Sequence, residues 1–330
     1  SKLLRAKLKP LLHLAPDVPD VLPQHVLKDY VLPPVADAFP ELHFPTDPDK
    51  AERARYRFDF EQILLRQLLT LRTRQDWRDR QTAPRIPYDA QIAKTFVESL
   101  PWPLTDDQRR AIHEILKDLN ADKPMMRMLQ GDVGSGKTAV AAIAANQAAA
   151  AGYQAAIMAP TEVLARQHAQ TLTELLSDHT VVLLLGSQGA KEKREAKAAI
   201  ESGEADVAVG THALIQQDVE FAKLGLAVVD EQHRFGVEQR NALRQETTPH
   251  LLNMTATPIP RSLALVAFGD QDLSVIEEMP AGRKPVSTEL VTAETWAGAF
   301  DRIRAELQAG RQAFVVYPVI EDSKAGLRAA

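Results

Sequence analysis

The chain lacks cysteine altogether, and this absence excludes several kinds of site. A disulfide framework, a zinc ribbon, an iron–sulfur cluster and a thiol nucleophile each need cysteine side chains. Long apolar runs are also missing, since none approaches the roughly 20 residues that span a bilayer. The first residues, SKLLRAKLKPLLHLAP, are interrupted by Lys2, Arg5, Lys7 and Lys9. These features predict a cytoplasmic protein with no membrane partner.

Aromatic residues and positive charge are scarce as well. Aromatic residues make up 5% of the chain, which disfavours a base-stacking platform of the single-strand-binding type. The 39 basic and 44 acidic residues leave a net charge of −5. Any contact with nucleic acid must therefore come from local basic patches, such as residues 2–9 and 66–85. Hydrophobic residues supply 45% of the 330 positions, enough for a folded core and about two domains.

The prolines are concentrated near the N-terminus, where nine of the 21 fall before residue 50. We expect residues 1–50 to form an irregular, proline-rich tether. Residues 51–85 should form a long helix, because Phe60, Leu64, Leu68 and Leu71 recur at helical spacing. The arginines in its C-terminal half form either a surface for nucleic acid or a solvated helix face, and the solvated face is favoured.

Short apolar runs alternate with helical patterns from residue 125 onward, which is the βαβ rhythm of a parallel sheet. This rhythm predicts an α/β domain over residues 86–281, with helices on both faces of the sheet. Its strands are expected at residues 125–129, 155–158, 181–185, 207–209, 226–229 and 251–254. Gly152 is expected to end the first helix at a positive φ angle. A second, incomplete α/β unit is expected over residues 282–330, with strands at 286–291 and 313–317 around a helix at 294–308.

Residues 131–138 read GDVGSGKT, a full match to the phosphate-binding loop between a predicted strand and a predicted helix. The glycines allow backbone N–H groups to converge on phosphates at the positive end of the helix. Lys137 can reach the β and γ phosphates, and the Thr138 hydroxyl can ligate Mg²⁺. The sequence therefore predicts that ATP and Mg²⁺ bind here, held by residues of this loop: Gly131, Gly134, Ser135, Gly136, Lys137 and Thr138.

A second motif, LAVVDEQH, spans residues 226–233. It has the Walker B pattern of an apolar strand that ends in two carboxylates. Ligands of open α/β sheets bind at the carboxyl edge of the strands. Asp230 is therefore the expected metal partner beside the phosphate loop. Glu231 is the expected base that orients and deprotonates the attacking water.

The string MTATPIPR at residues 254–261 places the hydroxyls of Thr255 and Thr257 after the next strand, with Arg261 beyond them. These three residues are candidates for coupling between two lobes. Taken in order, GDVGSGKT, DEQH and MTATPIPR resemble the motor core of superfamily 2 helicases and translocases. The resemblance implies a RecA-like fold and ATP hydrolysis coupled to DNA.

Within that superfamily, longer strings resemble the RecG branch over nearly the whole chain. They are DEQHRFGV at 230–237, TATPIPRSLAL at 255–265, MPAGRKP at 279–285 and LHFPTDPDKAERARYRFDFEQILLRQL at 42–68. Transcription-repair coupling factors are similar through the motor but lack the pattern at 42–68. The resemblance thus favours RecG-type remodelling of branched DNA, at stalled forks and Holliday junctions.

The resemblance also implies roles for individual residues. Gln108 is a nucleotide contact, although Thr105–Gln108 could equally be only a helix N-cap. The segment APTEVLARQH at 159–168 and the turn after residue 209 imply DNA-phosphate contacts. The candidates for DNA contact are Thr161, Arg166, Gly210, Thr211 and Arg234. Gln232 and His233 are expected to couple the γ phosphate to lobe movement and are counted with Lys137, Asp230 and Glu231 as catalytic.

Three functions remain open at this point. The first is a RecG-type ATP-dependent helicase or translocase, expected to act as a monomer in the bacterial cytoplasm at the nucleoid, with single-stranded DNA-binding protein as a further partner. The second is a coupling-factor motor on duplex DNA. The third is a nucleotide-gated DNA-binding module without turnover, which would have no need of a base at Glu231. RecG proteins also have a wedge domain and a complete second lobe, and we expect both to lie outside this segment.

Overall fold

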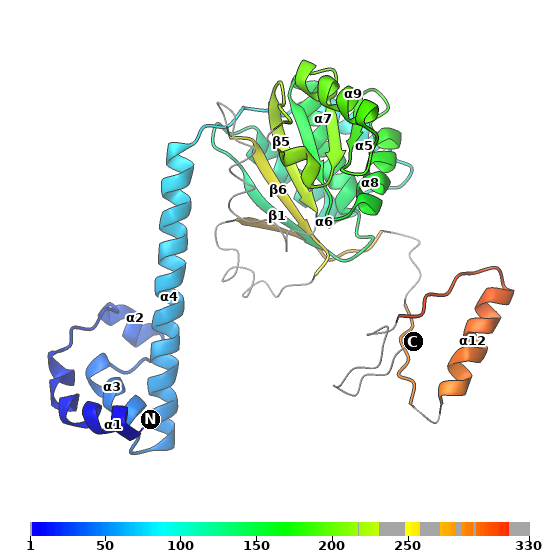
Figure 1. The fold of residues 1–330 in the computed structure, drawn as a ribbon. Coiled ribbons are helices and arrows are strands. Elements are labelled where there is room, and N and C mark those ends of the chain that lie inside the picture. The colour runs from blue at the N-terminus through cyan, green and yellow to red at the C-terminus, as the bar shows by residue number, and fades with distance from the viewer. Residues whose placement is uncertain are drawn as a thin grey trace. The chain divides into compact units, whose positions relative to one another are not determined.

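The computed structural model describes residues 2–216, 218–230, 248–257, 271–280, 286–292 and 295–316. The chain divides into two compact units, Ser1–Ala281 and Gly282–Ala330. The first contains an N-terminal group of helices, a long helix and a sheet with its covering helices (Figure 1). Its helices are α1 (Lys2–Leu8), η1 (Lys9–Asp17), α2 (Gln24–Asp29), α3 (Val35–His43), α4 (Pro48–Arg80), α5 (Ala90–Ser99), α6 (Asp106–Leu119), α7 (Lys137–Ala150), α8 (Glu162–Leu175), α9 (Ala190–Ser202) and η2 (His212–Ile215).

The sheet of the first unit has seven strands in the order β3-β4-β2-β5-β6-β1-β7. The strands are β1 (Met126–Gly131), β2 (Gln154–Met158), β3 (Val181–Leu184), β4 (Val207–Gly210), β5 (Leu224–Asp230), β6 (His250–Thr255) and β7 (Asp272–Ile276). Every pairing in it is parallel. The predicted α/β class is therefore confirmed. The sequence patterns missed β7, a short strand that pairs with β1 and lies at the edge of the sheet formed by the described residues.

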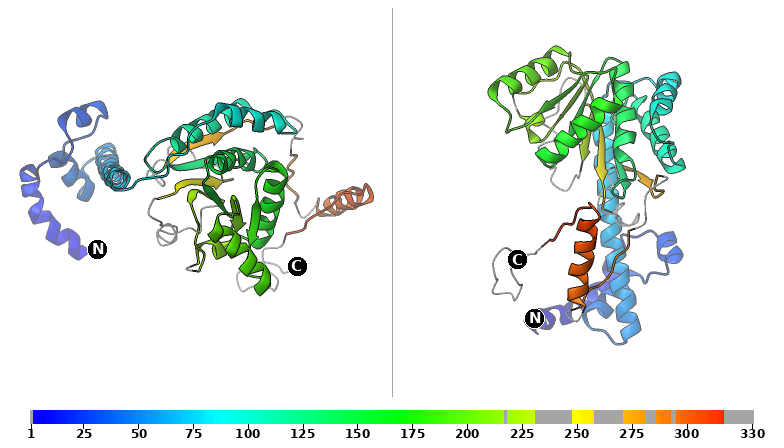
Figure 2. Two further views of the ribbon diagram at one scale, coloured as in Figure 1. Left: turned by 90° about the horizontal axis from the view of Figure 1, so that it is seen from above. Right: turned by 90° about the vertical axis from the view of Figure 1, so that its right-hand side faces the viewer.

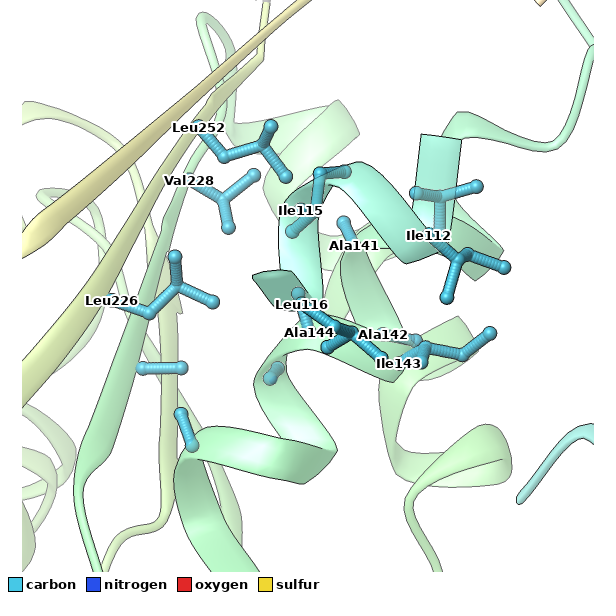
Figure 3. Packing of buried hydrophobic residues seen from close by; sticks show 14 of the residues in the cluster. Ile112, Ile115, Leu116, Ala141, Ala142, Ile143, Ala144, Leu226, Val228 and Leu252 are labelled. Atoms are coloured by element: carbon cyan, nitrogen blue, oxygen red, sulfur yellow. The ribbon is translucent and has the colours of Figure 1, made fainter. Parts of the chain in front are cut away.

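One face of the sheet packs against α6 and α7. Alternate side chains of a strand point to opposite faces, so Leu226 and Val228 of β5 share this face with Leu252 of β6. Figure 3 shows them opposite Ile115 of α6 and the alanines of α7. The other face carries Ala156, Met158, Ala227 and Val229, packed with α9 and η2. Helices thus cover both faces, as predicted, and Figure 2 shows the layers from two further directions.

Helix α7 is buried along most of its length, which explains its alanine content. Eleven consecutive residues, from Ala139 to Ala149, are buried, because α7 lies against β1, β2 and β5 and is in contact with α5, α6 and α8. Small side chains let the neighbouring backbones approach closely. The helix ends at Gly152, whose φ of 78° is in the left-handed region. Tyr153 N–H donates to the Ala148 carbonyl at 2.9 Å, and Gly152 N–H donates to that of Ala149 at 2.9 Å, as in a Schellman motif.

The expectation of an irregular tether at residues 1–50 is wrong, because α1, η1, α2 and α3 occupy much of it. Three of these prolines lie at helix starts: Pro23 and Pro34 are the N-cap residues of α2 and α3, and Pro48 is the first residue of α4. Pro16 and Pro40 lie inside η1 and α3. A helix start does not need the N–H that proline lacks. Part of the proline pattern therefore marked the starts of helices.

Of these short helices, α3 packs on the N-terminal half of α4, η1 packs on α3 and α1 packs on η1 (Figure 1). The centre of the contact is Arg57, which is fully buried and pairs with Asp20 at 2.6 Å and with Glu61. Asp20 also accepts the N–H groups of Leu22 and Val35 at 3.0 and 2.8 Å. Breaking a buried pair of this kind is strongly destabilising, because it leaves an uncompensated charge.

The C-terminal end of α4 joins the sheet at its amino edge. Arg74 pairs with Asp272, at the start of β7, at 2.5 Å, and Gln81 accepts a bond from the Thr248 hydroxyl, just before β6, at 2.6 Å. Arg74 is thus engaged within the fold, which removes it from the possible nucleic-acid surface. Leu68 and Leu71 of the predicted apolar stripe are exposed.

The second unit contains the expected helix, α12 (Trp296–Gln308). The expected strands are absent from the described residues, because 286–292 and 311–316 have no regular structure there. A strand persists only where a neighbour pairs with its backbone groups, and these two segments have no ladder partner among the described residues. Gly310 follows the helix at a φ of 74°. No helix in the described ranges is long and apolar enough to cross a bilayer.

His250 makes the stability of the sheet depend on pH. Its ring is fully buried at the start of β6. Nδ1 accepts the Met125 N–H at 3.1 Å and Nε2 donates to the Pro84 carbonyl at 2.8 Å, so the neutral ring satisfies both partners. Burial lowers the pKa of His250 from its ordinary 6.5, against the raising effect of the Pro84 bond. Below about pH 6.5 this residue therefore binds more protons in the unfolded chain than in the folded one. The free energy of unfolding falls as the pH drops through this range.

We predict that His250→Gln lowers the free energy of unfolding by about 1–3 kcal/mol at neutral pH. It should also flatten the decline of stability between about pH 7 and pH 5. Urea unfolding at several pH values measures both effects, with His25→Gln on the exposed face of α2 as the matched control. An unchanged pH slope in His250→Gln would contradict this account.

Candidate nucleotide site and nucleic-acid contacts

The two phosphate-site motifs end at one edge of the sheet. Met254 of β6 is paired with Leu129 of β1 on one side and with Asp230 of β5 on the other. Figure 1 shows these three strands side by side. The ends of β1 and β5 are therefore two strand spacings apart, about 10 Å. The carboxylate of the Walker B motif and the loop that follows β1 thus share the carboxyl edge.

The phosphate loop curls through two glycines in the left-handed region. Gly134 has a φ of 78° and Gly136 a φ of 88°. Gly136 is also the N-cap of α7, so Lys137 and Thr138 begin the helix. The N–H groups of a first helical turn have no partner within the helix. They point, with the positive end of the helix dipole, at the space over the loop.

Three observations show that the loop fits a phosphate. A Cβ on Gly131 would lie 2.5 Å from the Ser135 hydroxyl, and one on Gly136 would lie 2.2 Å from Gln108 Nε2, so a larger residue at either position would force these side chains to move. The Ser135 hydroxyl is buried without a hydrogen-bond partner in the described part of the chain. Lys137 Nζ folds over the loop and donates to the carbonyls of Gly131 and Asp132 at 2.7 and 3.0 Å.

Gln108 forms the helix cap, one of the two roles that its sequence context left open, and it also contacts the phosphate loop. It forms a capping box with Thr105, because its Oε1 accepts the Thr105 N–H at 2.9 Å and its own N–H donates to the Thr105 hydroxyl at 3.2 Å. Its Nε2 also donates to the Ser135 carbonyl at 2.7 Å. The side chain is fully buried. Gln108 thus ties the start of α6 to the phosphate loop, and direct contact with a nucleotide stays a prediction.

The residues expected to hold Mg²⁺ provide few protein ligands of their own. No cluster of three or more acidic or histidine side chains able to hold a metal occurs in the described ranges. Asp230, at the end of β5, has a side chain 13% exposed and lies 2.9 Å from His168 Nε2. One carboxylate and the Thr138 hydroxyl suit a cation that takes its other ligands from phosphates and water. His168 was not among the expected site residues, although it is the last residue of the string APTEVLARQH.

Thr255 and Thr257 lie at the end of β6, the strand between β1 and β5. Their hydroxyls are 2.8 Å apart, and Thr257 N–H donates to the Thr255 hydroxyl at 3.2 Å. Thr255 is paired with Gln130, the residue before Gly131. The first part of the expected coupling string is thus adjacent to the phosphate loop.

Three of the candidates for DNA contact, Thr161, Gly210 and Thr211, lie farther along the same edge. Gly210 pairs with Met158 and with Leu184, so Thr161 and Thr211 follow neighbouring strands. A Cβ on Gly210 would be 2.3 Å from the Leu184 carbonyl, so packing alone requires glycine there.

Thr161 caps α8, because its hydroxyl accepts the Leu164 N–H at 3.3 Å. Ser187, through its hydroxyl and then its N–H, holds the pKa of Glu162 below its ordinary 4.5, with help from Arg166. An ionised Glu162 opposes a phosphate at this helix start, so the exposed Arg166 is the group suited to attract one.

Several expected site residues lie outside the described residues. They are Glu231, Gln232, His233, Arg234 and Arg261. Their roles stay predictions.

Comparisons with known proteins bear on this site. A family model of DEAD/DEAH box helicases matches residues 105–266. The ATP-dependent DNA helicase RecG of Bacillus subtilis is 46% identical over 316 residues, which are 95% of this chain and 46% of that protein. The RecG helicase of Thermotoga maritima is 44% identical over 307 residues, or 92% of this chain and 39% of that protein. The chain belongs to the RecG family.

A solved structure of RecG bound to a three-way DNA junction has the same fold. It is 41% identical, with a TM-score of 0.80, and the match covers 92% of this chain and 41% of that one. This likeness confirms the RecA-like helicase fold expected from the motifs. The chain spans less than half the length of these RecG relatives.

The cradle geometry predicts that Gly136→Ala weakens nucleotide binding. The substitution places a Cβ against Gln108 and forces alanine into the left-handed region, at about 1–2 kcal/mol. We expect the affinity for Mg-ADP to fall about tenfold or more. The double variant Gly136→Ala/Gln108→Ala should not restore it, because the backbone strain stays.

Gly189→Ala is the matched control, since a Cβ there meets nothing within 4 Å. Calorimetric titration with Mg-ADP gives the affinities, and thermal unfolding reports the strain. Tight Mg-ADP binding by Gly136→Ala would show that the loop does not bind phosphate as described.

Proposed function

We propose that this chain is the ATP-binding motor segment of a RecG-type DNA helicase or translocase that remodels branched DNA, such as stalled forks and Holliday junctions. The observation that carries the proposal is the phosphate loop lying at the same sheet edge as Asp230, joined to it through β6. Support comes from the 46% identity to a RecG helicase and from the likeness to a RecG structure that holds a three-way junction.

In this proposal the phosphate loop binds and orients the nucleotide. The N–H groups of Gly134 to Thr138 hold the phosphates, and Lys137 exchanges its loop carbonyls for phosphate oxygens. Gln108 keeps the loop in shape through Ser135. Asp230 and Thr138 hold the cation. Bound Mg-ATP would supply the transferable phosphoryl group and a cation that neutralises its charge.

The remaining assignments extend from this loop. Glu231 accepts the proton of the attacking water, and Gln232 and His233 sense the γ phosphate. The coupling residues are Thr255, Thr257 and Arg261. DNA phosphates contact the edge formed by Thr161, Arg166, Gly210, Thr211 and Arg234. Monomeric action, a cytoplasmic location at the bacterial nucleoid and contact with single-stranded DNA-binding protein belong to the proposal on the family resemblance alone.

Turnover is tested by Glu231→Gln in the intact protein. The amide keeps the shape and hydrogen bonding of the side chain but cannot accept a proton. We expect Mg-ATP affinity within about threefold of wild type and hydrolysis reduced by about 10²–10⁴-fold. Phosphate release with a three-way junction measures the rate. A near-wild-type rate would remove Glu231 as the base and favour a nucleotide-gated binding module.

The DNA edge is tested by Arg166→Ala. Because the net charge is −5, we expect DNA affinity to be weak and salt-sensitive. Loss of one phosphate contact should weaken binding about equally for junction and duplex and reduce the salt slope by about one. Lys94→Ala on α5 removes an equal charge elsewhere and serves as control. Titrations of labelled junction and duplex at several salt concentrations decide the matter, and an unchanged slope in Arg166→Ala would exclude this residue.

A further inference from the structure

His168 contacts the carboxylate at the end of β5 from a helix that belongs to a different motif. Its Nε2 is 2.9 Å from Asp230 Oδ2, across 62 residues of sequence. An ionised carboxylate only accepts hydrogen bonds, so Nε2 carries the proton and donates. Both side chains are largely shielded from solvent, at 12% and 13% exposure. His168 is the hydrogen-bond partner of the Asp230 side chain within the described residues.

His168 lies on the buried face of α8. The helix buries Ala165 and Leu172 completely, and these residues lie seven positions apart on one face. They contact the strands and the neighbouring helices. His168 lies between them on this face, and its ring nitrogen bonds to Asp230. An apolar side chain at position 168 could not hold the carboxylate.

We infer that His168 is a positioning residue, which fixes the Asp230 carboxylate in the orientation that binds the cation of Mg-nucleotide. The inference rests on the proposed function, in which Asp230 is a cation ligand. The bond engages one carboxylate oxygen and restrains rotation of the group, which would leave the second oxygen available to a cation. Partners that orient a ligand in this way affect metal affinity by about 10–100-fold.

The same bond ties the cation site to α8. That helix begins beside Thr161 and carries Arg166 on its exposed side. Because His168 is in the second turn of α8, a shift of this helix also shifts the donor that holds Asp230. The orientation of the carboxylate therefore depends on the position of the helix that carries two candidates for DNA contact.

The test compares nucleotide binding with and without the cation, in the intact protein. Calorimetry with ADP is run in EDTA and at graded Mg²⁺ concentrations for wild type, His168→Ala and His168→Gln. Gln167→Ala, on the exposed side of the same turn, is the control. We expect His168→Ala to raise the Mg²⁺ concentration for half-maximal effect at least tenfold, with metal-free ADP affinity within about twofold of wild type. His168→Gln, whose amide can still donate, should recover most of the loss.

Two results would overturn the inference. One is a Mg²⁺ dependence of His168→Ala equal to that of Gln167→Ala. The other is a parallel loss of metal-free and Mg²⁺-bound affinity, which indicates a purely structural role. If His168→Ala does not fold, the Gln variant and the pair Asp230→Asn and Asp230→Asn/His168→Gln give the answer: the histidine change should have no further effect once the carboxylate is gone. A wild-type protein without Mg²⁺-dependent ADP binding would instead disprove the proposed function itself.

Discussion

The pairing of β6 with both β1 and β5 is the constraint on which the candidate site depends. Because all three strands are parallel and share a register at Met254, the loop after β1 and the carboxylate after β5 come to one edge. A slip of one residue in either pairing would turn the strand's side chains to the opposite face. The apolar side chains of β5, packed against α6 and α7 on one face and α9 on the other, oppose such a slip.

The phosphate loop inherits its rigidity from the elements around it. Helix α7 is buried along nearly its whole length, because its small side chains let the neighbouring elements pack closely against it. It therefore cannot shift easily. Gln108 adds a second anchor by joining the start of α6 to the Ser135 carbonyl. The loop is therefore held from both ends, and the left-handed glycines between them give it its curl. A preorganised set of N–H donors needs little rearrangement to receive phosphates.

Sequence patterns predicted those parts of the fold that depend on local chemistry. Six of the seven strands, the glycine stop after α7 and the start of the phosphate helix follow from runs of a few residues. The patterns failed where a partner decides the outcome. Residues 286–292 have a strand-like composition but no ladder. The prolines before residue 50 predicted a tether. In the structure, however, Arg57 pairs with Asp20, which lies 37 residues away in the sequence.

The sequence by itself therefore predicted the chemistry of the nucleotide site, because GDVGSGKT and the Walker B acids each place their functional groups within a few consecutive residues. It also determined the family, since identity extends along nearly the whole chain. Only the tertiary structure decided that Gln108 holds the Ser135 carbonyl and that His168 holds Asp230. Those partners are 27 and 62 residues apart, and no local periodicity encodes which side chains meet when a parallel sheet brings distant strand ends to one edge.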